Sequence, residues 1–252
     1  MSQDIPDWER PYFDPGGGNP FLYYTAFGNI PEKSLPGQHY RCAGIPEGCD
    51  LRKYDRDRDP AVIEAFMDGY LWDWLRQERP SLARDVSAAS MCLVLSGGPV
   101  DPRTLNYLRD AVGLLTFFLD NGATALYDPQ MFQFWSPEGW RSRIFDPAGP
   151  VPRHHVVILL SDEPDGTLWV HTRGMRKFGR PDISVRSVDR ERLDGAVDLC
   201  NRFIEYQAFG GRIPEGKEIM MASLPPGGRA YHAGDLEDPD FNNVHIEIVW
   251  TR

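Results

Sequence analysis

Residues 167–185, TLWVHTRGMRKFGRPDISV, bring a tryptophan, a histidine, four cations and an aspartate together in one short stretch. Side chains alternate between the two faces of a β-strand, so the segment LWVHTR places His171 and Arg173 on the same face. The same alternation in the segment DISVRSV places Asp182 and Arg186 on one face. If the two strands pair, these four side chains form one polar cluster.

This cluster has the residue types needed to bind an anion or to transfer a proton. His171 would act as acid or base, Arg173 would hold an anion through its planar guanidinium, and Asp182 would orient the imidazole. The intervening loop, GMRKFGRP, adds cations, and its glycines allow a ligand to approach the backbone closely. The catalytic candidates are therefore His171 and Asp182, and the ligand-binding candidates are Trp169, Arg173, Arg176, Lys177 and Arg180.

A solvated sheet face with local ion pairs would show the same pattern, so the sequence leaves both interpretations open. Ser161 follows an apolar strand but lacks the Gly-x-Ser-x-Gly turn of serine hydrolases, and no nucleophile–base pair is identifiable. No metal and no cofactor are predicted, because the histidines show neither HxH nor HExxH spacing. The acidic run DLEDPD lacks the DxDxDG pattern of a calcium loop and predicts an exposed turn.

Strong local signals predict the elements that would position the cluster. Pro164-Asp165-Gly166 separates two β-rich runs and predicts a hairpin, after which DISVRSV forms a third strand. Asp189 then precedes a helix through Leu193, Val197, Cys200, Phe203 and Ile204, which ends near Gly210-Gly211. The segments KEIMMASL, GGRAYHAGD and VHIEIVW predict closing strands.

The rest of the chain mixes loops, helices and strands. Residues 1–57 are rich in Gly, Pro and Tyr and predict ordered loops and short strands. Asp59-Pro60 predicts a helix start, and the pattern breaks again at Pro80. MCLVLSGG predicts a buried strand, Asp101-Pro102 a second helix start, and ATALYD a further strand. We therefore expect an α+β fold with a mixed, largely antiparallel sheet and helices packed on it.

We expect the chain to divide into two parts. Residues 1–90 would form an irregular N-terminal segment with a helix packed on the core, and residues 91–252 would form the α+β core domain. A chain of 252 residues with 41% hydrophobic residues is long enough to build such a core.

Composition narrows the class of partner. The net charge of -10 disfavours general binding of nucleic acids, whose phosphates an acidic chain repels. No apolar run reaches the roughly 20 residues of a membrane helix, and MSQDIPDWERPYF lacks the features of a secretory signal. We therefore expect a cytoplasmic protein without membrane contact. Its four cysteines are expected to be unpaired thiols.

The segments ATALYDPQMFQFWSPEGW and LWVHTRGMRKFGRPDISV resemble a bacterial family of unknown function. The similarity runs from about Met91 onward and includes Asp128-Pro129-Gln130, Trp135 and the stretch TRGM…FGRPD. No reaction is established for that family, so the resemblance assigns no catalytic residue. It implies an association with immunity or accessory proteins of bacterial toxin systems.

Two hypotheses follow. The first is a non-enzymatic binding or interaction protein, such as an immunity or accessory factor, whose acidic surface suits a basic protein partner. The second is an enzyme for a small anionic or carbonyl substrate that uses His171, Arg173 and Asp182. The position of the His171 ring, in the floor of a pocket or on an open face, distinguishes them. The sequence predicts no oligomeric state.

Overall fold

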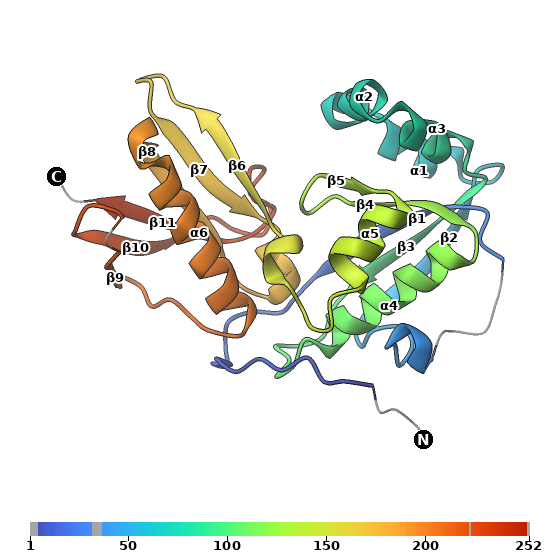
Figure 1. The fold of residues 1–252 in the computed structure, drawn as a ribbon, viewed down its shortest axis with the longest axis horizontal. Helices are drawn as coiled ribbons and strands as arrows, with labels where there is room; N and C mark the ends of the chain where they lie inside the picture. The colour runs from blue at the N-terminus through green and yellow to red at the C-terminus, as the bar shows by residue number, and fades with distance from the viewer. Residues whose placement is uncertain (1–4, 32–36, 222, 251–252) are drawn as a thin grey trace. The chain divides into compact units, whose positions relative to one another are not determined.

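The computed structural model describes residues 5–31, 37–221 and 223–250, which form two compact units. The first unit comprises Met1–Trp8, Phe21–Pro99 and Thr104–Pro150. The second unit comprises Glu9–Pro20, Val100–Arg103 and Val151–Arg252. Each unit contains one sheet and its own helices (Figure 1). Among the described helices, none has the length and apolar character needed to cross a lipid bilayer.

The sheet of the first unit is antiparallel throughout. Its strands, in spatial order, are β2 (Cys49–Asp55), β3 (Met91–Gly97), β1 (Leu22–Gly28), β4 (Ala123–Asp128) and β5 (Gln133–Trp135). Helix α4 (Asn106–Asp120) connects β3 to β4, and β1 lies between these two strands. The predicted strand–helix–strand unit is therefore present, with a strand from earlier in the chain inserted into it.

Among the described residues of the first unit are four further α-helices, and Pro residues mark the start of three of them. They are α1 (Pro60–Glu64), α2 (Gly69–Glu78), α3 (Pro80–Ala88) and α5 (Pro137–Trp140). Proline is favoured in the first helical turn because its missing N–H has no partner there. The helix predicted at Asp59-Pro60 is confirmed, and so is the break at Pro80. Helices α1 to α3 contribute Ile63, Trp72, Leu75, Leu82 and Val86 to one buried cluster with Phe27 and Phe134.

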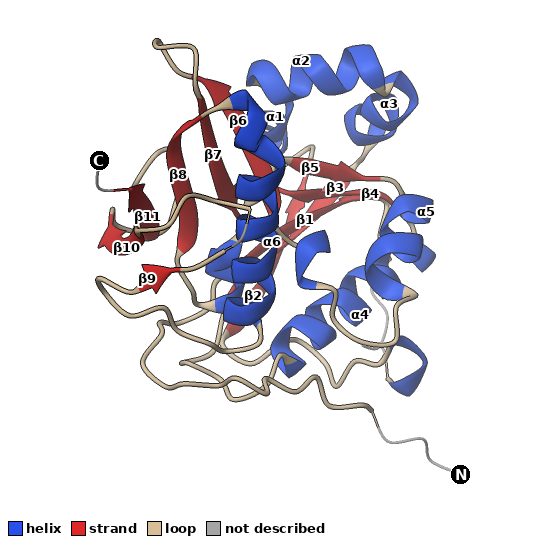
Figure 2. Cartoon of the chain, turned by 60° about the vertical axis from the view of Figure 1, so that its left-hand side comes forward, coloured by secondary structure: helices blue, strands red, loops and turns tan. Residues whose placement is uncertain are grey.

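The sheet of the second unit contains the predicted hairpin. Its spatial order is β6 (Val157–Asp162), β7 (Leu168–Arg173), β8 (Asp182–Val188), β11 (His245–Trp250), β10 (Gly228–Ala233) and β9 (Glu218–Ile219). Among the described strands of this sheet, only β8 and β11 are parallel neighbours; the other pairs are antiparallel. Helix α6 (Leu193–Ala208) lies along one face of the sheet (Figure 2). There it shares a buried core with the sheet, to which Leu199 and Cys200 from the helix and Val170 and Val185 from the strands contribute.

The α+β prediction is confirmed, with two sheets in place of one. The division of the chain differs from the predicted boundary at residue 90. Strand β2, which ends at Asp55, pairs with β3, which begins at Met91, so the two sides of that boundary share a sheet. The four cysteines are free thiols, and Cys42, Cys92 and Cys200 are buried.

Asp101-Pro102 does not start a helix, and this prediction is wrong. Helix α4 begins at Asn106, whereas Asp101 has a positive φ of 29°. The Asp101 carboxylate accepts a hydrogen bond from the Gly16 amide at 2.6 Å and contacts Arg180. A tertiary contact thus uses the side chain that would otherwise cap the helix.

Candidate functional site

The predicted site residues lie on β7, on β8 and in the segment between these two neighbouring strands of the second unit. Strands β6 and β7 pair through a tight turn, in which the Gly166 amide donates to the Glu163 carbonyl at 3.0 Å. Strand β8 pairs with the other edge of β7, and His171 lies opposite Ser184. Opposite residues in an antiparallel pair share a face, so these two side chains lie on the face that is turned away from α6.

Asp182 is not positioned to orient His171. Its Oδ1 accepts hydrogen bonds from the Thr172 hydroxyl at 2.8 Å and from the Met175 amide at 3.2 Å. Its Oδ2 accepts from the Asn243 side-chain amide at 2.9 Å. Burial raises the pKa of this carboxyl to about 6, and the same hydrogen bonds oppose that rise. Asp182 therefore fastens the start of β8 to the turn that follows β7.

Three of the predicted ligand-binding cations donate to backbone carbonyls. Arg173 Nη1 donates to the Asp240 carbonyl at 2.6 Å, and Arg176 Nη1 donates to the Asn242 carbonyl at 3.0 Å. Lys177 is fully buried, and its Nζ donates to the His155 carbonyl at 2.8 Å. Arg173 and Arg176 thus hold the acidic loop that precedes β11, and Lys177 holds the segment that precedes β6.

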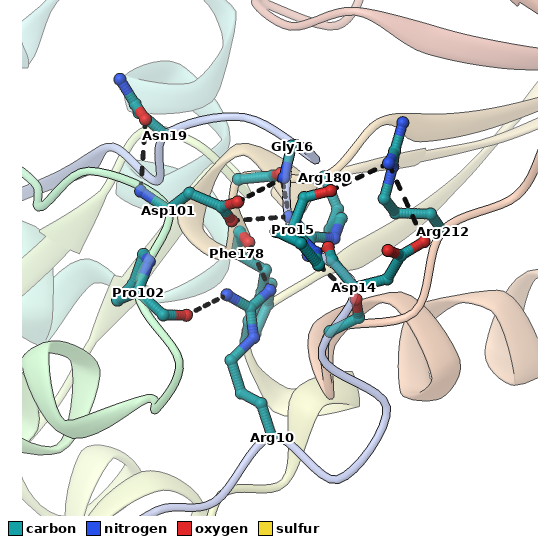
Figure 3. Close-up of polar contacts among 12 residues, drawn as sticks. Arg10, Asp14, Pro15, Gly16, Asn19, Asp101, Pro102, Phe178, Arg180 and Arg212 are labelled. Carbon is teal, nitrogen blue, oxygen red and sulfur yellow. Dashed lines mark hydrogen bonds and ion pairs between the residues drawn. The ribbon is translucent and has the colours of Figure 1, made fainter.

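Arg180 uses all its donors inside the second unit (Figure 3). Its side chain is 1% exposed and donates to four carbonyls and one carboxylate. The acceptors are Gly211 at 3.2 Å, Gly179 at 2.9 Å, Asp14 at 3.1 Å, Gly210 at 2.9 Å and the Asp101 carboxylate at 3.4 Å. A guanidinium has five N–H donors, so none is left for a ligand. Gly17 lies against it, and a Cβ there would come within 1.9 Å of Arg180 Nη1.

Two further arginines hold the same segment (Figure 3). Arg10 donates to the carbonyls of Pro102 and Phe178, both at 2.9 Å. Arg212 donates to the Pro15 carbonyl at 2.9 Å. The segments 9–20 and 100–103 are thereby fixed to the loop after β7 and to the end of α6. The arginines of this region have a structural role that the sequence did not reveal.

A second group of side chains lies on the sheet face opposite α6, and we call it the aromatic–histidine face. It consists of Trp169, His171, Ser184, Arg186, Phe241, His245 and Glu247. The Trp169 and His171 rings stack with centroids 3.9 Å apart, and the Arg186 guanidinium lies 4.0 Å from the Trp169 centroid. Phe241 meets the edge of His171 and stacks on His245 at 4.1 Å.

The imidazoles of this face are neutral at neutral pH. Burial lowers the pKa of His171 to about 4, and burial also lowers the pKa of His245. The Nδ1 atom of His171 has no hydrogen-bond partner among the described residues. Burial raises the pKa of Glu247, whereas the hydrogen bond with Ser184 and the positive charge of Arg186 lower it. The face is therefore suited to stacking and to contact with an exposed arginine. Its His245 ring lies 4.0 Å from the Glu247 carboxylate and 3.8 Å from the Asp238 carboxylate.

Strand β6 forms the edge of the sheet beside this face. Leu159 lies opposite His171, and Ser161 lies opposite Trp169. Leu160 is 52% exposed, and the last three residues of β6 are all exposed. Within residues 5–31, 37–221 and 223–250, only β7 pairs with β6. The outer edge of β6 therefore presents backbone N–H and C=O groups that no other described strand satisfies.

Sequence reasoning found Trp169, His171 and Arg173 on one face but missed Phe241, His245 and the edge of β6. Alternation in VHIEIVW places His245 and Glu247 on one face, which was an available signal. Among the described residues, no group of three or more His, Cys, Asp or Glu side chains is arranged to hold a metal ion.

Comparisons with known proteins give no match. No family model, no curated protein and no solved structure is significantly similar to the chain. The resemblance to a bacterial family from Met91 onward therefore stays a prediction.

Proposed function

We propose that this chain is a non-enzymatic interaction protein that binds an extended segment of a basic partner protein along β6. The observation that carries the proposal is the unpaired outer edge of this strand, whose first five residues are uncharged and whose last three are exposed. An unpaired strand edge is a template for a further strand, and peptide recognition commonly uses this geometry.

The first unit shows what a protected edge looks like in the same chain. Strand β2 is also an edge strand, and four of its seven residues are charged. Arg52 pairs with Asp50 at 3.4 Å, and Lys53 pairs with Asp55 at 3.3 Å. Charged side chains on an edge oppose strand addition. In β6 the first five residues, VILLS, are uncharged, so this protection is missing there.

Charge favours a basic partner. The hairpin turn next to β6 carries Asp162, Glu163 and Asp165, and the chain as a whole has a net charge of -10. Complementary charge speeds association and disfavours wrong partners. A strand added to β6 would place alternate side chains beside Leu159 and Ser161, which lie opposite His171 and Trp169 of the aromatic–histidine face. Tryptophan and arginine are enriched among the residues that dominate binding energy.

An immunity or accessory role, in which this acidic protein covers a basic partner, is one form of the proposal. The enzyme alternative has less support, because the Asp182 carboxylate is engaged by Thr172, Met175 and Asn243. His171 then lacks the carboxylate that was predicted to orient it.

A defined peptide tests the proposal. A fluorescent peptide of alternating lysine and valine should bind the wild type, and Leu160→Lys should weaken binding by about tenfold, or 1.4 kcal/mol. The matched control is Val249→Lys, since Val249 is 41% exposed on β11, an interior strand of the same sheet. It should change the affinity less than twofold. Equal effects of both substitutions, or equal binding of an alternating glutamate–valine peptide, would contradict the proposal.

A further inference from the structure

A cavity of about 670 Å³ lies between α6 and residues 212–221 of the second unit. Its volume falls within the roughly 300–1,000 Å³ typical of small-molecule sites. The residues that line it come from one unit: Asp14, Leu199, Arg202, Phe203, Tyr206, Arg212, Ile213, Pro214, Lys217, Glu218, Ile219, Met220 and Met221.

The inner wall of the cavity is apolar. Leu199, Ile213 and Ile219 belong to the core of the unit, and each is less than 10% exposed. Phe203 and Met221 are partly buried against the same core. At the rim, Met220 is 84% exposed. Methionine is flexible and polarisable, and it adapts to varied apolar ligands. The wall therefore fits an aliphatic chain.

The charge of the cavity is opposite to that of the chain. Three cations, Arg202, Arg212 and Lys217, and two carboxylates, Asp14 and Glu218, line it. The charged residues that line the cavity therefore sum to one positive charge, whereas the chain as a whole has a net charge of -10. A cationic rim on an acidic protein attracts an anionic ligand locally.

Lys217 is the cation that is available to a ligand. Arg202 pairs with Asp198 at 2.9 Å, and Arg212 donates to the Pro15 carbonyl and lies 3.8 Å from Asp14. Lys217 makes no ion pair within the described part of the chain. One uncommitted ammonium balances one negative charge, which suits a carboxylate better than a dianionic headgroup.

We propose that this cavity binds a single-chain amphiphile with a carboxylate headgroup. The aliphatic chain lies along Leu199, Phe203 and Met221, and the carboxylate meets Lys217 at the rim. The inference goes beyond the proposed interaction at β6 and does not depend on it.

Calorimetry with decanoate, below its micelle concentration, tests the inference. Decanoate should bind the wild type, and decyltrimethylammonium, which has the opposite headgroup charge, should bind at least about tenfold more weakly. Acetate should not bind, because it lacks the chain. The absence of measurable heat with decanoate at concentrations up to about 1 mM would overturn the inference. A Kd of 1 mM corresponds to a binding free energy of only about 4 kcal/mol. Equal affinity for the two amphiphiles would overturn the inference as well.

Variants locate the site. Met220→Asp places a carboxylate at the rim without disturbing the core, since Met220 is 84% exposed. It should weaken decanoate binding by about tenfold, whereas Leu236→Asp, at an exposed position outside the cavity, should leave it unchanged. Lys217→Ala should weaken decanoate binding more than it weakens decanol binding. Identical affinities in Met220→Asp and Leu236→Asp would show that decanoate binds elsewhere. Unfolding midpoints measured on each variant exclude misfolding as the cause.

Discussion

Replacing Arg180 by lysine tests whether this residue supports the fold or binds a ligand. The substitution keeps the positive charge but reduces the donors from five to three. In the structure the guanidinium serves five acceptors, and its side chain is fully buried. At least two of these acceptors therefore lose their partner. Four of the five are backbone carbonyls, and a buried carbonyl without a partner is costly.

The magnitude follows from that count. A hydrogen bond that involves a charged group contributes about 1.5–3 kcal/mol, so two lost bonds predict a loss of about 3–6 kcal/mol in the free energy of unfolding. A natural domain has only about 5–15 kcal/mol in total. Arg180→Lys is therefore expected to lose much of the stability of the second unit. If Arg180 were an exposed ligand contact, the same change would stay within about 0.5 kcal/mol.

Urea unfolding followed by circular dichroism and tryptophan fluorescence measures the difference. Arg190→Lys is the matched control, because Arg190 pairs with Asp162 and both side chains are more than 60% exposed. It should change the free energy of unfolding by less than about 0.5 kcal/mol, as exposed ion pairs do. A loss below about 1 kcal/mol for Arg180→Lys would refute the structural role that we assign to the five hydrogen bonds.

Three further predictions concern stability and thiol chemistry. Arg173→Lys should lower the urea midpoint, because it weakens the contact that holds the Asp240 carbonyl; an unchanged midpoint would return Arg173 to the ligand-binding candidates. Burial lowers the pKa of His155 to about 3, so the unfolded chain takes up a proton first as the pH falls below about 6.5. The contribution of His155 to stability should be complete above that pH and should fall by up to about 1.4 kcal/mol per unit towards pH 3, with the His155 and His171 rings still neutral by NMR at pH 5. The four thiols should all titrate in urea but react slowly in the native state at pH 8. Burial raises the pKa of Cys92 to about 11 and that of Cys200 to about 12, so few thiolates are present at pH 8. A fast reaction of the native protein would contradict the burial of these thiols.

Local signals predicted the elements of the fold well. Pro164-Asp165-Gly166 gives a hairpin because the turn needs a positive φ, and Gly166 has a φ of 86°. Pro60 begins helix α1, since proline is favoured in the first helical turn. These signals act within a few residues, so the sequence alone contains them.

Contacts between distant segments were not predictable in the same way. Asp101-Pro102 has the chemistry of a helix start, but the Asp101 carboxylate binds the Gly16 amide, 85 residues earlier. The acceptors of the cations after β7 are backbone carbonyls. Because every residue has a carbonyl, nothing in the sequence indicates that these cations are already engaged and not free to bind a ligand. Only the fold shows that Asp240 and Asn242 supply the carbonyls for Arg173 and Arg176. The same reason explains why Phe241 was missed as a partner of His171.

The two proposed sites can be tested independently because they lie at opposite edges of one sheet. Strand β6 is the first in the order and β9, which contributes Glu218 and Ile219 to the cavity, is the last. Five strand spacings of about 4.8 Å separate them by about 24 Å. Substitutions more than about 10 Å apart without shared partners have additive effects. Leu160→Lys should therefore leave decanoate binding unchanged, and Met220→Asp should leave peptide binding unchanged. Loss of both activities in either variant would mean that the variant disturbs the common core of the second unit, and neither site could then be inferred from it.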